Sequence, residues 1–139
     1  MGTHGKYGND VLRKAAGASF RGSGRTVEID LGRGKAQIDG TIGNRIAIEI
    51  ESRTSKQVRG AVLDLILHPF PKKLLILEPV YMDVQKTAIQ CEFILAKFVR
   101  QEDFRVVVFA GSGQANYMER DIASVRSALA ELGLQEHAN

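Results

Sequence analysis

The sequence predicts a single α/β domain of 139 residues whose mixed central sheet is flanked by helices, in the order α-β-β-β-α-β-α-β-α. Two observations lead to this prediction. Apolar and polar residues alternate over residues 26–51, which is the period of half-buried strands. After Ser52 the period becomes that of amphipathic helices, and these alternate with unbroken apolar stretches typical of buried parallel strands. An antiparallel meander that leads into helix–strand units forms a mixed sheet.

The N-terminal half is expected to contain one short helix and three strands. Residues 9–17 have the pattern of a helix, with Asn9 or Asp10 near its N-cap and Gly17 at its C-terminal end. A basic loop, RGSGR, follows at residues 21–25. Glycine-containing turns then separate three predicted strands, which are TVEIDL at 26–31, AQID at 36–39 and RIAIEIE at 45–51.

The C-terminal half alternates helices with buried strands. Residues 54–67 carry an apolar stripe with helical spacing, begin at a capping Thr54 or Ser55, and end at the prolines of HPFP. The stripe consists of Val58, Ala61, Val62, Leu65 and Ile66. The remaining predicted elements are a strand at 72–80, a helix at 85–101, a strand at 104–110 and a closing helix at 116–132.

The composition is that of one globular domain spanning residues 1–139. Hydrophobic residues make up 44% and charged residues 25%, which is typical of soluble proteins, and no apolar run approaches the roughly 20 residues of a membrane helix. The N-terminal residues lack the apolar segment of a signal peptide, so we expect a cytoplasmic protein without a membrane association. The single cysteine, Cys91, excludes an internal disulfide and is expected to be a buried core thiol.

Basic residues are concentrated in the first 60 residues. This half contains eleven Lys or Arg and six Asp or Glu, whereas residues 61–139 contain eight and ten. A basic surface around a local group of carboxylates suits a polyanionic substrate that is bound through a metal ion. A solvated surface without a partner explains the same distribution, so the charge alone does not decide between the two.

Two glutamates are expected to stand together on the predicted strand at 45–51. Side chains alternate along a strand, so Ile46, Ile48 and Ile50 share one face and Glu49 and Glu51 share the other. The isoleucine face must enter the core. Both carboxylates therefore lie on the opposite face, about 7 Å apart along the strand.

Asp39 joins this face if the loop that leads into the strand at 45–51 has an odd number of residues. A three-residue loop of Ile42, Gly43 and Asn44 pairs Thr41 with Arg45, and its Gly and Asn suit a left-handed position. The cross-strand pairs that follow are Asp39 with Ala47, Gln37 with Glu49, and Lys35 with Glu51. A two-residue loop would instead bury Asp39 unpaired.

The preceding hairpin is expected to add a fourth acid. Pairing Ile29 with Ile38 puts Leu31 beside Ala36, around a four-residue loop with the sequence GRGK. Glu28 then lies opposite Asp39, close to the other carboxylates.

Carboxylates gathered on one face repel each other unless a cation lies among them. Divalent cations such as Mg²⁺ prefer oxygen ligands and often use one or two carboxylates, completing their shell with water and phosphate oxygens. The alternative is a set of surface salt bridges from these acids to Lys35, Arg45 and Arg53.

The topology and these acids together resemble the PD-(D/E)XK nuclease superfamily, which has the three-layer restriction-endonuclease-like fold. The topological similarity covers roughly residues 9–79, and the motif, IDG followed by EIE, lies within residues 38–52. Asp39 and Glu49 match the metal-binding Asp and Glu of the family. Glu51 stands where the family usually has Lys, and Ile38 replaces the Pro of the motif.

The resemblance implies a hydrolase that cleaves DNA phosphodiester bonds, an endonuclease such as a type II restriction enzyme. Asp39, Glu49 and the backbone carbonyl of Ile50 would hold Mg²⁺, or Mn²⁺, to activate the attacking water. Glu51 would hold a second metal or orient this water. Lys35 would supply the positive charge of the missing lysine, unless it only pairs with Glu51 across the strands.

Substrate contacts and assembly follow from the same reading. Lys56, Gln57 and Arg59 begin the helix after the motif and are candidates for contacts with the DNA backbone, as are Arg21 and Arg25 in the basic loop. Solvated surface residues are the alternative for both groups. A chain of this size carries one such site, so cleavage of both strands would require a homodimer or a partner subunit.

Two further functions compete with the nuclease. In the first, the fold survives as a catalytically inactive DNA-binding or subunit-interaction module, and Glu51 marks the lost chemistry. In the second, an unrelated α/β domain binds a nucleotide at Gly111–Gly113, in the glycine-rich turn after the last strand. This turn lacks the lysine of a P-loop, and a tight strand-to-helix connection explains it as well.

Overall fold

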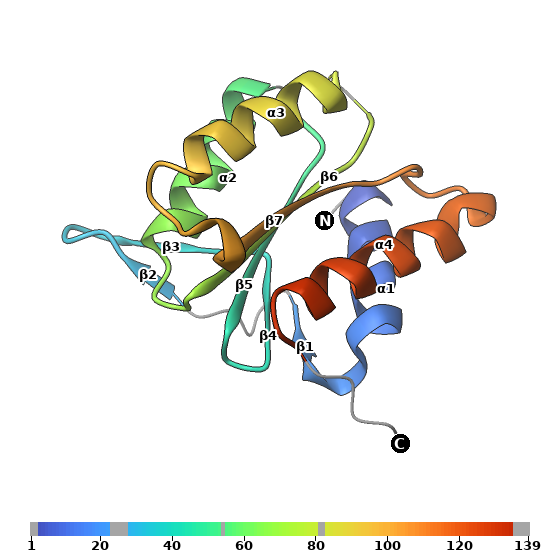
Figure 1. Cartoon of the computed structure of the whole chain (residues 1–139), viewed down its shortest axis with the longest axis horizontal. Helices are drawn as coiled ribbons and strands as arrows, with labels where there is room; N and C mark the ends of the chain where they lie inside the picture. The colour runs from blue at the N-terminus through green and yellow to red at the C-terminus, as the bar shows by residue number, and fades with distance from the viewer. Residues whose placement is uncertain (1–2, 23–27, 54, 81–82, 135–139) are drawn as a thin grey trace.

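The computed structural model describes residues 3–22, 28–53, 55–80 and 83–134, and it is an α/β fold with a five-stranded mixed sheet between two pairs of helices (Figure 1). The strands lie in the order β1 (Phe20–Arg21), β4 (Gly40–Ile42), β5 (Ile46–Glu51), β6 (Lys72–Leu77) and β7 (Phe104–Val108). β1, β4 and β5 are antiparallel neighbours, whereas β5, β6 and β7 are parallel. The mixed sheet flanked by helices agrees with the prediction. The predicted order was wrong in its first half, because five strands rather than three lie between the first two long helices of the described chain.

Four helices cover the two faces of this sheet. They are α1 (Thr3–Ala16), α2 (Ser55–Leu67), α3 (Val84–Leu95) and α4 (Met118–Glu131). α1 and α4 pack on the face that carries Ile46, Ile48 and Ile76, and α2 and α3 pack on the face that carries Ala47 and Leu75. None of the helices described is long and apolar enough to cross a membrane. Cys91 of α3 is buried, as predicted, and burial raises the pKa of its thiol to about 11.

The first helix is longer than predicted. It begins at Thr3, so Asn9 lies in its middle and is buried rather than forming the N-cap, and Asp10 is likewise internal. The prediction was wrong because Tyr7, with its buried neighbours one turn further on, extends the apolar face toward the N-terminus. The helix does end at Gly17, whose φ of +62° is the left-handed conformation typical of a helix end.

The β4–β5 hairpin has the predicted loop length but a different register. Its three-residue loop is residues 43–45, and Ile42 pairs with Ile46, so the predicted pairing of Thr41 with Arg45 was wrong. Gly43 and Asn44 take the left-handed positions, with φ of +61° and +53°. This choice buries both isoleucines completely, whereas the predicted loop would have exposed one of them. The shift is two residues, so each side chain keeps its predicted face.

The second hairpin forms a separate two-stranded ribbon of β2 (Glu28–Asp30) and β3 (Lys35–Gln37). The pairs are Glu28 with Gln37, Ile29 with Ala36, and Asp30 with Lys35, so the predicted pairs of Ile29 with Ile38 and of Glu28 with Asp39 were wrong. The four-residue loop is therefore residues 31–34 rather than the predicted 32–35. Within it, the amide of Leu31 donates to the carbonyl of Gly34. Ile38 is then free to enter the core beneath α2 and α3.

Lys35 therefore does not face Glu51. It lies opposite Asp30 in the ribbon, because β3 pairs with β2 and ends before the chain reaches the main sheet. The predicted pair of Lys35 with Glu51 required one continuous strand from residue 35 to residue 42. The chain instead breaks its strand at Ile38 and Asp39, so the ribbon and the sheet are separate.

The C-terminal elements agree in kind with the prediction and are shorter. Alternate residues of β6 pack against α1 and α4 on one face of the sheet and against α2 and α3 on the other, which confirms that this strand is buried on both faces. α3 stops at Leu95, where the predicted helix continued to residue 101. The amides of Phe98 and Val99 both donate to the carbonyl of Leu95, at 3.0 and 2.8 Å, and this tight turn closes the helix. The predicted strands at 72–80 and 104–110 end at Leu77 and Val108.

The glycine-rich turn after β7 is bound by a carboxylate of the protein itself. Asp121 of α4 is buried and accepts hydrogen bonds from the amides of Ala110 and Gly111, at 2.7 and 3.0 Å. It also accepts one from the hydroxyl of Tyr7, at 2.5 Å. A side chain at Gly111 would meet the Cβ of Tyr117 at 2.7 Å. The turn is thus a tight connection, and a phosphate at these two amides would have to displace Asp121.

Candidate active site

The candidate site forms where β4 stops and β5 continues. The last pair of β4 and β5 is Gly40 with Ile48, so residues 49–51 extend beyond their partner strand. Asp39, directly before β4, occupies this open edge. The amide of Ile50 donates to Oδ2 of Asp39 at 2.7 Å, and the amide of Asp39 donates to Oε1 of Glu49 at 2.8 Å. These bonds hold the two carboxylates beside each other on the predicted face. The predicted pairs of Asp39 with Ala47 and of Gln37 with Glu49 were wrong, because Ala47 pairs with Thr41.

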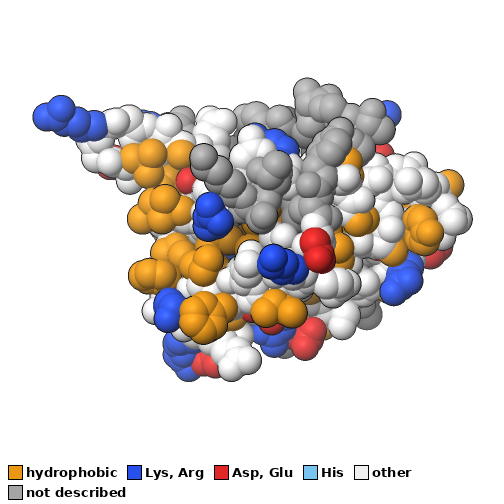
Figure 2. Space-filling model, turned by 90° about the horizontal axis from the view of Figure 1, so that it is seen from above, with side chains coloured by type: hydrophobic (Ala, Val, Ile, Leu, Met, Phe, Trp, Pro, Cys, Tyr) orange, Lys and Arg blue, Asp and Glu red, His pale blue; other side chains and the backbone are white. Residues whose placement is uncertain are grey.

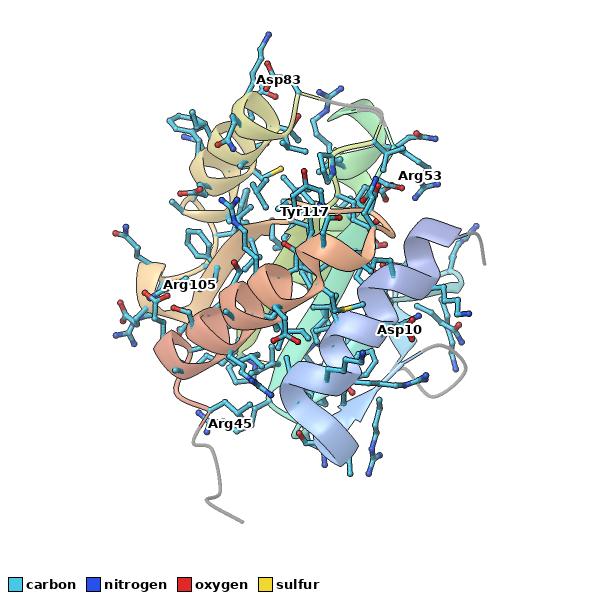
Figure 3. The ribbon with its side chains drawn as sticks, turned by 90° about the vertical axis from the view of Figure 1, so that its right-hand side faces the viewer. Asp10, Arg45, Arg53, Asp83, Arg105 and Tyr117 are labelled. Carbon is cyan, nitrogen blue, oxygen red and sulfur yellow. The ribbon has the colours of Figure 1, made fainter. Side chains whose placement is uncertain are left out.

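Glu51 also lies at this end of β5, but Arg53 occupies both of its carboxylate oxygens. Nε and Nη2 of Arg53 donate to the two carboxylate oxygens at 2.6 and 2.7 Å, and the amides of Ser52 and Arg53 donate to Oε1. Burial acts to raise the pKa of Glu51, but the bonds from Arg53 outweigh it, so the pKa is lowered. Of the predicted salt bridges, the one to Arg53 is therefore present. Figure 3 shows Arg45 at the opposite end of the molecule from Arg53.

Asp39 and Glu49 are electrostatically unfavourable as a pair of anions. Burial, followed by repulsion from Asp39, from Asp64 of α2 and from Glu51, raises the pKa of Glu49 to about 9. The pKa of Asp39 is also raised, first because protein atoms displace water from its carboxylate and then because of Glu51. Its outer side nevertheless remains exposed to solvent. A cation beside the pair would relieve this repulsion.

The donor set fits a hard divalent cation. Oδ1 of Asp39 and Oε2 of Glu49 take no part in the two reciprocal bonds. The amide and carbonyl of one strand residue point to the same side, so the carbonyl of Ile50 faces the edge that Asp39 occupies. No group of three His, Cys, Asp or Glu side chains suited to a metal occurs in the described parts of the chain. Two carboxylates with water and phosphate oxygens are a common Mg²⁺ environment.

Arg53 is the cation beside the carboxylates, a place that sequence reasoning gave to Lys35. It was considered only as a salt-bridge partner, and Lys35 was expected to supply the positive charge. In the structure, the side chain of Arg53 is 61% exposed, and its charge is stabilised by Glu51 first and by Asp39 and Glu49 as well. The spacing E-x-R directly after a strand was the available signal, because the chain can fold back there.

Glu78 is a buried acid at the same end of the sheet and was not identified from the sequence. Its amide continues the β5–β6 ladder by donating to the carbonyl of Glu51 at 3.0 Å. The side chain is fully buried beside Gly8 of α1, and neither carboxylate oxygen has a hydrogen-bond partner among the described residues. Burial first, then repulsion from Asp121, Asp39 and Glu51, raises its pKa to about 8. An acid that directly follows an apolar strand was the only local signal.

The predicted DNA contacts are spread over several surfaces. Arg21 is exposed in β1, at the edge of the sheet, whereas Arg25 lies outside the described residues. Lys56 lies in the first turn of α2, and Gln57 and Arg59 are exposed on that helix. Arg59 borders a groove between α2 and α3.

Comparisons with known proteins found no matching family model, no matching curated protein and no matching solved structure.

Proposed function

We propose that the protein is a metal-dependent DNA endonuclease of the PD-(D/E)XK type, with Asp39 and Glu49 as its metal ligands. The observation that carries the proposal is the reciprocal pair of hydrogen bonds that holds these two carboxylates at the open edge of β5, 2.7 and 2.8 Å from the adjacent backbone amides. The α/β fold with its mixed sheet, and the two acids from neighbouring strands, are features that this superfamily combines. The restriction-endonuclease-like fold is part of the proposal.

The residues of the chain have distinct roles in this proposal. Asp39, Glu49 and the carbonyl of Ile50 would hold Mg²⁺ or Mn²⁺, which would supply an activated water and neutralise charge on the scissile phosphate. Arg53 replaces the lysine of the family. Glu51 accepts both guanidinium bonds and so fixes Arg53 beside the carboxylates, where its exposed side chain can contact a phosphate oxygen.

A DNA-binding or subunit-interaction module without cleavage is the second candidate. It is favoured by the hydrogen bonds of Glu51, whose two carboxylate oxygens accept from the guanidinium of Arg53 and from the adjacent amides. Such a module would keep the fold and a phosphate-binding arginine while lacking the catalytic lysine. It would bind DNA without a requirement for a divalent metal.

One assay separates the two candidates. The protein is incubated with supercoiled plasmid in Mg²⁺ or Mn²⁺, with EDTA as the control, and nicked and linear products are measured on a gel together with binding by mobility shift. We expect nicking in either metal and none in EDTA. Binding that is the same with and without metal, with no nicking under any condition, would establish the module instead.

A further inference from the structure

The β2–β3 ribbon projects from the body of the molecule. In the described parts of the chain its two strands pair only with each other, whereas the other five strands form the main sheet. Figure 1 shows the ribbon extending to the left of that sheet, with its turn at the far end. Residues 30–35 and Gln37 are exposed. The ribbon is therefore an arm that reaches into solvent.

The root of this arm is fixed in the core. Ile29 of β2 is 1% exposed and Ile38, directly after β3, is 3% exposed, and both pack in the core beneath α2 and α3. Ala36 pairs with Ile29 across the ribbon and packs partly buried against the same core. The direction of the ribbon is thus set before any partner binds, which lowers the entropic cost of binding.

The turn of the ribbon carries positive charge and little bulk. Residues 31–35 have the sequence LGRGK, with two basic residues and no acid. Arg33 is exposed at the centre of the turn, and Figure 2 shows a basic side chain at the far left end of the molecule, where the ribbon ends. Gly32 and Gly34 on either side have no side chains and adopt positive φ angles, +84° and +118°. Such a tip is complementary to a polyanion with a narrow opening.

The dimensions of the ribbon match the major groove of DNA. Sheets with their side chains are about 10 Å thick, and neighbouring strands lie about 4.8 Å apart. The major groove is about 12 Å wide and admits a two-stranded ribbon, whereas the minor groove is only about 6 Å wide. In the major groove an arginine can donate to O6 and N7 of guanine, and an apolar side chain such as Leu31, which is 49% exposed, can contact the methyl group of thymine.

The ribbon leads directly into the candidate active site. β3 ends at Gln37, and the exposed Asp39 follows one residue later. The chain from Arg33 to Asp39 spans no more than about 20 Å, at about 3.3 Å per residue. This is the length of about six base pairs of DNA. A duplex with one phosphate at Asp39 can therefore present the adjacent stretch of its major groove to the ribbon.

We propose that the β2–β3 ribbon enters the major groove of a DNA duplex, with Arg33 as its main contact, and so positions the duplex at Asp39. The inference rests on the proposed function for the identity of the substrate as DNA, and it deepens that function by making the substrate double-stranded. A single strand has no groove, and the major groove of duplex RNA is too deep and narrow for side chains to read. Arg33 acts on substrate binding and not on the metal ligands.

DNA binding measured without cleavage tests this proposal. A labelled duplex about two helical turns long is titrated in EDTA and followed by fluorescence anisotropy. The wild type should bind this duplex at least about ten-fold more tightly than either the single strand or the RNA duplex of the same sequence. Arg33→Glu should weaken duplex binding at least about ten-fold, the loss expected for one good base contact. Bulky groups at C5 of the pyrimidines, which fill the major groove, should weaken wild-type binding by about the same factor.

Arg45→Glu is the matched control. Arg45 is also an exposed arginine in a hairpin turn, and it lies at the opposite end of the molecule from Arg53, which stands beside the site (Figure 3). The change of charge is the same, and at physiological salt charges act over only about 8 Å, so duplex binding should stay within about two-fold of the wild type. Both variants should keep the Mn²⁺ affinity and the circular dichroism of the wild type.

Wild-type affinity in Arg33→Glu, an equal loss in Arg33→Glu and Arg45→Glu, or equal wild-type affinity for the plain and the C5-modified duplex would overturn the proposal. The fate of the nuclease is read separately from plasmid nicking. Nicking by the wild type together with undiminished duplex binding by Arg33→Glu would keep the nuclease and remove the ribbon. Duplex binding that depends on Arg33, without nicking in either metal, would support the ribbon and contradict the nuclease.

Discussion

Asp39→Asn is expected to slow Mg²⁺-dependent cleavage of plasmid DNA by at least about 100-fold. Asn keeps an oxygen that can accept the hydrogen bond from the amide of Ile50, which is 2.7 Å long in the structure, so the local backbone should be preserved. It removes the negative charge that a divalent cation requires at the open edge of β5. The loss should therefore reside in catalysis and metal dependence rather than in folding.

Two further variants make this result specific. Glu49→Gln should cause a loss of similar size, because Glu49 is the second ligand and its Oε1 already bonds to the amide of Asp39. Asp10→Asn, the same substitution on α1, should retain the wild-type rate. Cleavage rates are measured as nicked product over time at saturating metal. Equal rates for wild type and Asp39→Asn would remove the basis of the proposed site.

Glu78→Gln is expected to change the pH dependence of stability by several kcal/mol. The pKa of Glu78 is raised from 4.5 to about 8 in the folded protein, mainly by burial. As the pH rises from about 4.5 to 8, the unfolded chain releases this proton while the folded protein keeps it, so the free energy of unfolding falls. Above pH 8 the carboxylate is ionised in both the folded and the unfolded state, and the loss of stability no longer changes with pH. Its full size is on the order of 5 kcal/mol.

Glutamine does not ionise, so Glu78→Gln lacks this pH-dependent loss of stability. The free energy of unfolding, measured by urea denaturation, should be higher for Glu78→Gln relative to the wild type at pH 9 than at pH 5. The change in this difference between the two pH values is the informative quantity, because a fixed cost of the buried amide cancels. Glu119→Gln, on the exposed surface of α4, should show no such change. A difference between wild type and Glu78→Gln that is independent of pH would show that Glu78 is not held protonated.

The faces of the strands could be predicted because their cause is local. Ile46 and Ile48 alternate with Ala47 and Glu49, and a period of two residues assigns each of them to a face whatever the rest of the chain does. The same reasoning correctly brought Asp39 to the side of Glu49. The helices after Ser52 followed from their apolar stripe for the same reason.

The hairpin registers could not be predicted because they depend on the whole core. Three-residue loops at 42–44 and at 43–45 satisfy the same local pattern, and burial of both Ile42 and Ile46 decides for the second. Lys35 was misplaced because nothing in its neighbourhood shows that the strand breaks before Asp39. The role of Arg53 depends on a local fold-back onto Glu51, for which the E-x-R spacing was the only signal. The state of Glu78 depends on tertiary contacts with Gly8 and α4, which no spacing in the sequence reveals.

Mn²⁺ binding shows whether Asp39 and Glu49 form a divalent metal site. Free Mn²⁺ is titrated against the protein and followed by electron paramagnetic resonance, with Mg²⁺ as the competitor. We expect one bound Mn²⁺ per chain, displaced by Mg²⁺, lost in Asp39→Asn and in Glu49→Gln, and retained in Asp10→Asn. No Mn²⁺ binding by the wild type, or binding that is unchanged in Asp39→Asn, would contradict it.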